Sequence, residues 1–355
     1  MREKGDDDVG LTRSSRIPAL MSTLVTAAVL VAATSGCSEV VLPPGTQGAG
    51  SSASPSASMR DVGAARPLPV PQEVAAKLSG FIYLLAGPDQ EDQNVWMIGG
   101  HTERQLTFGT KSNAISSVGA AAAGVVVSDD QFHADDLAKV TTRGAWWLPA
   151  GRTSRLHQGS SATISARGKI AFVAVPHALG YRDSKTFELR SQDSFTSGSQ
   201  VVYQSRTPLS DPVFGPAGQI AFIAQPKTSD YDSTKVLVRS ANGHLRVVKT
   251  GLPNPDSLVW SANAADLVVA SWPLKAEAIG SNGKRKLLPA GWFPLAWDPA
   301  GTKLLVASKT SIGLWAPAHP AVVHVLGPLS PGVVVGPASW VQKRAPLAVP
   351  SVRRR

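Results

Sequence analysis

The chain has one cysteine, Cys37, among its 355 residues, so no disulfide can form within it. Charged residues make up only 17% of the sequence and aromatic residues only 6%. No Gly-x-Ser-x-Gly, His-Glu-x-x-His or glycine-rich phosphate loop occurs. These absences exclude a disulfide-held fold and argue against the common hydrolase, zinc-protease and nucleotide-binding classes. We therefore expect no enzymatic activity and no cofactor.

Glycine and proline, by contrast, are frequent, with 32 and 27 residues. With ordinary apolar content, this balance favours an all-β protein with many turns over a helical one. The net charge is +10, but the cations are scattered except at 284–286 and 353–355. We interpret the positive charge as a contribution to solubility, or as a source of weak attraction to an anionic membrane, and we expect no nucleic-acid partner.

An uncharged apolar run, 17–34, is preceded by Arg13 and Arg16 and followed by Ser35, Gly36 and Cys37. A basic flank, an apolar core and small residues before a cleavage point are typical of a secretion signal. With cysteine first after the cut, the segment resembles that of bacterial lipoproteins. The resemblance implies that Cys37 carries lipid and holds the protein on the outer face of the cytoplasmic membrane. The alternatives are an uncleaved membrane anchor and an incidental thiol.

Residues 45–58 are almost all small and polar, which predicts a flexible tether without a packed core. The predicted organisation is therefore a signal peptide at 1–36, a tether at 37–66, one folded domain at 67–345 and a basic tail at 346–355. We expect the domain to be a monomer.

A repeat fills the folded domain. Short β-branched runs recur at intervals of 37 to 50 residues and begin at Phe81, Val125, Ile170, Ile220, Leu267 and Leu304. This period, with several short strands in each unit, is typical of propeller blades. Four runs follow a turn that begins at Ser165, Gly215, Ser261 or Asp298. The large residues before three of these turns, Phe214, Trp260 and Trp297, are expected to pack between neighbouring blades.

Two phrases carry a family resemblance: Trp297-Asp-Pro-Ala-Gly-Thr-Lys-Leu-Leu-Val, and Asn94-Val-Trp-Met-Ile-Gly-Gly-His-Thr-Glu-Arg-Gln-Leu-Thr. They resemble the TolB-type, WD40-like propeller repeat over roughly residues 80–342. The family's Asp in the turn is absent from every copy. The resemblance implies protein–protein contact through one face of the disc.

The predicted fold is an all-β, six-bladed β-propeller with four-stranded blades. The first unit lacks an innermost strand, and a spare strand lies at 337–342, so we expect the C-terminal strand to close the first blade. The alternatives are seven blades, if 67–80 holds a degenerate unit, and a pair of β-sandwiches.

The loops between the second and third strands of the first four units are the longest, which favours them as a binding face. Lone loop histidines seldom catalyse, so we interpret the face as a surface for an envelope protein. Its candidate residues are Asp92, Asp129, Asp130, His133, Asp135, Asp136, Trp147, His177, Tyr181, Asp183, Tyr231 and Asp232.

Two other functions stay open. Asp129, Asp130, Asp135 and Asp136 are oxygen ligands that could bind calcium, although no Asp-x-Asp-x-Asp-Gly spacing is present. A calcium or small-ligand sensor is therefore one alternative. The other is an envelope hydrolase or lyase acting on glycans or peptides, in which His133 and His177 would meet the loop acids.

Overall fold

A computed structural model describes the folded part of this chain. The chain divides into two units, 1–61 and 62–355, and every described residue belongs to the second unit. The predicted signal segment, Cys37, the tether and the basic tail lie outside the described residues. The described ranges are 68–88, 93–106, 114–122, 124–131, 141–147, 154–157, 160–174, 186–194, 197–226, 233–261, 265–271 and 275–342.

The strands of these residues form six four-stranded antiparallel sheets, here lettered A to F and given from the innermost strand outward. Sheet A is β24 (Val334–Val341), β1 (Phe81–Gly87), β2 (Asn94–Gly99) and β3 (Thr102–Gln105). Sheet B is β4 (Ala114–Ala121), β5 (Gly124–Gln131), β6 (Thr141–Trp147) and β7 (Ser154–His157). Sheet C is β8 (Ser160–Ile164), β9 (Ile170–Ala174), β10 (Phe187–Gln192) and β11 (Gln200–Ser205).

The remaining sheets repeat the same plan. Sheet D is β12 (Leu209–Phe214), β13 (Ile220–Ala224), β14 (Lys235–Arg239) and β15 (Leu245–Val248). Sheet E is β16 (Pro255–Trp260), β17 (Leu267–Ser271), β18 (Lys275–Ile279) and β19 (Arg285–Leu287). Sheet F is β20 (Phe293–Trp297), β21 (Leu304–Ala307), β22 (Ser311–Trp315) and β23 (Val323–Pro328).

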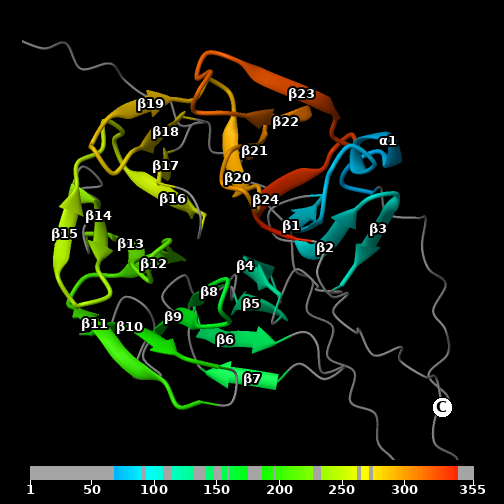
Figure 1. Ribbon diagram of the computed structural model, residues 1–355. Coiled ribbons are helices and arrows are strands. Elements are labelled where there is room, and N and C mark those ends of the chain that lie inside the picture. Colours follow the sequence, from blue (N-terminus) through cyan, green and yellow to red (C-terminus); the bar gives the residue numbers. More distant parts are fainter. Residues whose placement is uncertain are drawn as a thin grey trace, which may run out of the picture. The chain divides into compact units, whose positions relative to one another are not determined.

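The innermost strands contact one another in a closed cycle. Strand β24 contacts β4, and the contacts continue through β8, β12, β16 and β20 back to β24. Figure 1 shows the sheets following one another around this ring, with the last strand, in red, beside the first, in blue. The predicted all-β propeller with four-stranded antiparallel blades is confirmed, and the paired-sandwich alternative is wrong.

Each predicted β-branched run forms the second strand of its sheet, where both faces are covered by neighbouring blades. Strands β9, β17 and β21 are buried at every residue. Continuous apolar runs of this kind suit strands that are covered on both sides. The turns before them also form as expected, because the N–H of Gly168, Gly218 and Gly301 each donates to the carbonyl three residues earlier.

The large residues before these turns pack against the preceding blade, as predicted. Phe214 belongs to a buried cluster with Ala171 and Val173 of sheet C. The Trp260 ring lies against the backbone of Gly215 in sheet D. The Trp297 indole N–H donates to the carbonyl of Val259 in sheet E, at 3.4 Å.

The C-terminal strand closes the ring, which confirms the predicted closure. Strand β24 pairs antiparallel with β1 from Phe81↔Val341 to Gly87↔Val334. It thereby supplies the innermost strand that the first unit lacks, and it removes an open edge between the first and last blades.

A segment that we call the strap, residues 68–80, lies at the junction of sheets A and F. It contains the short helix α1 (Gln72–Ala75) and not a blade, so a degenerate seventh unit at this place is wrong. Val70, Val74 and Leu78 are buried in one cluster with core residues of both sheets. The Lys77 ammonium donates to the carbonyl of Leu326 at 2.7 Å.

Candidate functional site

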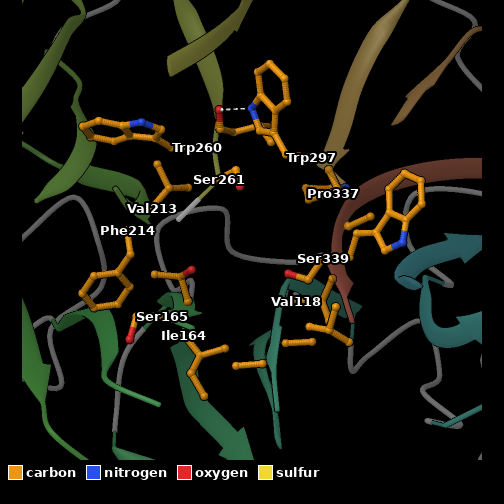
Figure 2. A pocket seen from close by; sticks show the side chains of 18 of the residues that line it. Val118, Ile164, Ser165, Val213, Phe214, Trp260, Ser261, Trp297, Pro337 and Ser339 are labelled. Carbon is orange, nitrogen blue, oxygen red and sulfur yellow. Dashed lines mark hydrogen bonds between the residues drawn. The ribbon is translucent and has the colours of Figure 1, made fainter. Parts of the chain in front are cut away.

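The inner strands surround a cavity of about 410 Å³ at the centre of the ring. All six innermost strands contribute to its wall, together with the turns that follow β8, β16 and β20. Figure 2 shows labelled side chains from several blades around this opening, with the hydroxyl of Ser339 directed into it. The polar side chains of the wall are Ser117, Ser161, Thr163, Ser165, Asp211, Ser257, Ser261, Asp298, Ser339 and Gln342.

Every innermost strand carries a β-bulge, where it has one residue more than the strand that it pairs with. The register shifts fall between Ser160 and Thr163 in β8 and between Ser210 and Val213 in β12. Equivalent shifts occur in the innermost strands of the other four sheets. Because a bulge bends a strand and increases its twist, the repeated bulges curve these strands around the cavity.

The bulges place polar residues of the repeat on the cavity wall. Ser161, Asp211 and Ser257 each stand four residues before a turn-opening residue, and all three line the cavity. Ser161 and Asp211 have positive φ angles of 51° and 46°. Such angles are uncommon outside glycine, and they often mark places where the backbone is held in position for a function.

The aromatic residues near the cavity make packing contacts between blades. In Figure 2 the rings of Phe214, Trp260 and Trp297 point away from the centre of the opening. Trp297 is only 4% exposed. The Trp340 indole N–H donates to the carbonyl of Ser79, which precedes β1. The structural interpretation of these tryptophans therefore agrees with their contacts.

The wall of the cavity has few charged side chains. The described lining residues include no His, Lys, Arg, Glu or Cys, and only two carboxylates, Asp211 and Asp298. Asp298 holds its own turn, because its Oδ1 accepts the N–H groups of Thr302 and Lys303 at 2.7 and 2.9 Å. The hydroxyls and backbone groups of the wall can hydrogen-bond a ligand.

The candidate binding-face residues remain predictions. Asp92, His133, Asp135, Asp136, His177, Tyr181, Asp183, Tyr231 and Asp232 lie outside the described residues. Asp129 and Asp130 lie in β5 and Trp147 lies in β6, with their side chains outside the described part. Each long loop joins the second strand of its sheet to the third. The described residues that flank these loops pair with each other at the end of the two strands, for example Ala86 with Asn94 and Ala224 with Lys235.

The polar wall of the cavity was not predicted from the sequence. The residues just before the turns were interpreted as structural, and the long loops were taken as the binding face. The signal was present, because Ser161, Asp211 and Ser257 occupy the same place in three repeats. A small polar residue recurring inside an otherwise apolar strand is the pattern that could have found them.

Glu103 of β3 is a buried carboxylate beneath the strap. Both of its carboxylate oxygens are buried without a hydrogen-bond partner in the described part of the chain. Burial raises the pKa of Glu103 from 4.5 to about 7. The backbone N–H of Val70 lies close enough to offset this rise in part, but its geometry is not that of a hydrogen bond. The basic side chains on the neighbouring segments, Lys77 and Arg104, make no ion pair with it among the described residues.

Glu103→Gln should make the stability of the domain less dependent on pH. Because the folded-state pKa lies above the ordinary value, the wild-type domain loses stability as pH rises from about 4.5 to about 7 and stays at the lower level above that. At pH 8 we expect Glu103→Gln to be more stable than wild type by about 1–2 kcal/mol, and at pH 5 nearly equal. Urea unfolding across this range measures the difference.

The exposed Glu73→Gln on α1 is the matched control, and it should leave the pH profile unchanged. An unaltered slope in Glu103→Gln would mean that this carboxylate is not desolvated in the folded protein.

Within the described ranges, no three His, Cys, Asp or Glu side chains lie close enough together to hold a metal ion. Asp135 and Asp136 lie outside those ranges, and the side chains of Asp129 and Asp130 are not among those described. Calcium binding at these four residues therefore stays a prediction. The described part of the chain also contains no helix with the length and apolar character needed to span a bilayer.

Comparisons with known proteins support the fold. No family model matches the chain, and no curated protein matches it. TolB from Acinetobacter baumannii is similar in structure, with a TM-score of 0.51 and 13% identity over 74% of this chain. The alignment spans 66% of the TolB chain, just under two thirds of its length.

Enzymes are among the solved structures with lower TM-scores to this chain. An oligogalacturonate lyase from Vibrio parahaemolyticus has a TM-score of 0.44 and 11% identity, covering 69% of this chain and 74% of its own. Dipeptidyl peptidase 4 from Porphyromonas gingivalis has a TM-score of 0.38 and 12% identity, covering 67% of this chain and 42% of its own. At these identities the comparisons identify a propeller fold similar to that of TolB and do not assign an activity.

Proposed function

We propose that this protein is an exported lipoprotein whose propeller binds another envelope protein without catalysing a reaction. Lipid on Cys37 would hold it on the outer face of the cytoplasmic membrane, and residues 37–66 would tether the ring to the lipid. The ring is taken to have six blades, one for each four-stranded sheet.

The observation that carries the binding role is the chemistry of the central cavity. Its described wall offers hydroxyls, apolar groups and two carboxylates, of which Asp298 is committed to its own turn, and it contains no His, Cys, Lys, Arg or Glu. General acid–base catalysis needs a titratable group beside the reacting atom, and nucleophilic catalysis needs an activated nucleophile. A wall made mainly of hydroxyls and apolar groups on a rigid ring favours recognition by shape and hydrogen bonds.

The residues at the mouth of the cavity are placed where a macromolecule could contact them. The turn after β8 brings the exposed Ala166 to the cavity wall, and the turns of sheets E and F contribute Ser261 and Pro299. A ring whose blades are held by buried clusters presents such turns without refolding, which limits the entropy lost on binding.

Two experiments in cells of the native host test the proposal: fractionation of the Cys37→Ser variant for the lipid anchor, and a photo-crosslinking amino acid at Ala166 for the binding site. Wild-type protein should fractionate with membranes and have the added mass of lipid, whereas Cys37→Ser should lack that mass and leave the membrane fraction. The probe at Ala166 should give a defined adduct with an envelope protein. The same probe at Val325, exposed on the outermost strand of sheet F, is the matched control.

The outcomes separate the two claims. Unchanged mass and membrane retention in Cys37→Ser would remove the lipid anchor. Equal adducts from both positions, or none from Ala166, would remove the cavity mouth as the binding site.

A further inference from the structure

The outer hairpins of sheets D and E are strongly basic. Hairpin 235–249 joins β14 to β15, hairpin 275–287 joins β18 to β19, and both are described at every residue. Glu277 is their only acidic residue, and it is 1% exposed, with Oε1 accepting the N–H of Gly251 at 2.7 Å. Their cations are Lys235, Arg239, Arg246, Lys249, Lys275, Lys284, Arg285 and Lys286.

The two hairpins form one surface, which we call the basic rim. Val248 of β15 and Ile279 of β18 belong to the same buried cluster, so the hairpins pack together. A Cβ on Gly251, in the segment after β15, would lie 2.9 Å from Nη1 of Arg285 on β19. The guanidinium of one hairpin therefore reaches the backbone that follows the other. Figure 1 shows β15 and β19 as the outer strands of neighbouring blades.

Exposed aliphatic side chains lie among these cations. Leu245, Val247 and Leu287 are 44%, 58% and 64% exposed. Leu287 pairs with Glu277, and Arg285 pairs with Ile279, so both project from the face of sheet E that is turned toward sheet D. Val247 pairs with Leu237, so it projects from the face of sheet D that is turned toward sheet C, and the aliphatic side chains lie on both sides of the outer edge. The carboxylate of Asp266, beside hairpin 275–287, is paired with Lys286 at 3.4 Å. Aliphatic groups flanked by the remaining Lys and Arg side chains match the boundary between lipid headgroups and acyl chains.

Protection of edge strands does not explain this pattern. Charged residues often keep an exposed edge strand from pairing with another chain. The outermost strand of sheet F, β23, is also an edge and exposes Val325, yet hairpin 311–328 contains no Lys, Arg, Asp or Glu. In sheet C, hairpin 187–205 has two acids and one cation. The outer hairpin of sheet B, 141–157, contains three arginines and no acid, so positive charge is not confined to sheets D and E. It is densest there, with eight cations on two adjacent hairpins.

We propose that the basic rim is a membrane-contact surface that lays the edge of the ring against an anionic lipid bilayer. The cations would meet the phosphates of the headgroups, and the exposed aliphatic side chains would enter the headgroup layer. The contact is local to the rim and does not need lipid on Cys37, although the proposed anchor would keep the rim close to a bilayer.

A single-thiol fluorescence experiment tests the contact with the full chain. Because Cys37 is the only cysteine, Cys37→Ser combined with Leu287→Cys gives one labelling site for an environment-sensitive dye. We expect a blue shift with vesicles containing phosphatidylglycerol and none with phosphatidylcholine alone, suppressed by high salt. The matched probe is Val325→Cys, on the uncharged hairpin of sheet F, which should respond to neither vesicle.

Charge reversal completes the test. Lys284→Glu with Arg285→Glu should weaken the response at position 287 about tenfold or more, since each cation near an anionic surface contributes to binding. Lys303→Glu with Lys309→Glu reverses two equally exposed cations of sheet F and should have little effect, and circular dichroism shows whether both variants fold.

Three results would overturn the proposal: equal shifts at positions 287 and 325, no preference for phosphatidylglycerol, or no loss on reversal at 284 and 285. A shift produced by soluble polyphosphate without vesicles would reassign the rim to a soluble polyanion. Absence of the wild-type protein from the membrane fraction of cells, with an intact response at 287, would instead count against the anchor alone.

Discussion

Trp297→Ala should lower the free energy of unfolding of the domain by about 3–5 kcal/mol, the range expected for removing a buried tryptophan side chain. Trp297 is 4% exposed and belongs to a cluster that joins sheets E and F, with Val268 and Leu304 among its members. Its indole N–H also donates to the carbonyl of Val259. Truncation would therefore leave a cavity between two blades and an unpaired carbonyl. Urea unfolding followed by circular dichroism measures the loss.

Trp297→Phe is the informative control. It keeps most of the ring but removes the indole N–H, so the expected loss is smaller, about 1–2 kcal/mol. A loss below about 1 kcal/mol in Trp297→Ala would mean that the ring does not hold neighbouring blades together.

The sequence was sufficient to predict the architecture because the determinants of a blade are local. Runs such as 170–174 and 304–307 are apolar at every residue, and only a strand covered on both faces needs that pattern. Asp298 and Gly301 predicted a turn because their side-chain and backbone chemistry fits one turn type, and the turn forms as expected. The spare strand at the C-terminus predicted closure because an unpaired edge is unfavourable.

The bulges could not be predicted, because pairing register depends on both strands together. Ser161 and Asp211 read as ordinary strand residues until their partners in β9 and β13 are known. The strap was missed for another reason. Its helix has only four residues, although Val70, Val74 and Leu78 recur at the spacing of one helical face. The acidic loops are still a prediction, since their side chains lie outside the described residues.

The wall of the central cavity and the basic rim have different chemistry, so the two surfaces suit different partners. The cavity wall contains no cation among its described residues, whereas the two outer hairpins contain eight. A rim that rests on lipid would leave the mouth of the cavity free for another protein. The two proposals can therefore be tested separately, by probes at Ala166 and Leu287.

Gly80→Ala should destabilise the closure of the ring by about 3 kcal/mol, through two separate effects. Gly80 has a φ of +79°, which L-residues other than Asn and Asp rarely adopt, and a Cβ there would lie 2.4 Å from the carbonyl oxygen of Val341. Strand β24 would have to move away from β1 to accept the methyl group. Urea unfolding should give the loss, and hydrogen exchange should rise along β24 more than in the other innermost strands.

Gly332→Ala separates the two effects. Its φ is +74°, close to that of Gly80, but a Cβ there would meet no atom within 4 Å. We expect it to cost only the conformational term, about 1 kcal/mol. The difference between the two variants then measures how much the domain depends on its closing strand. Equal losses would show that β24 can shift at little cost, and the ring would be held by the clusters between its blades and not by its closure.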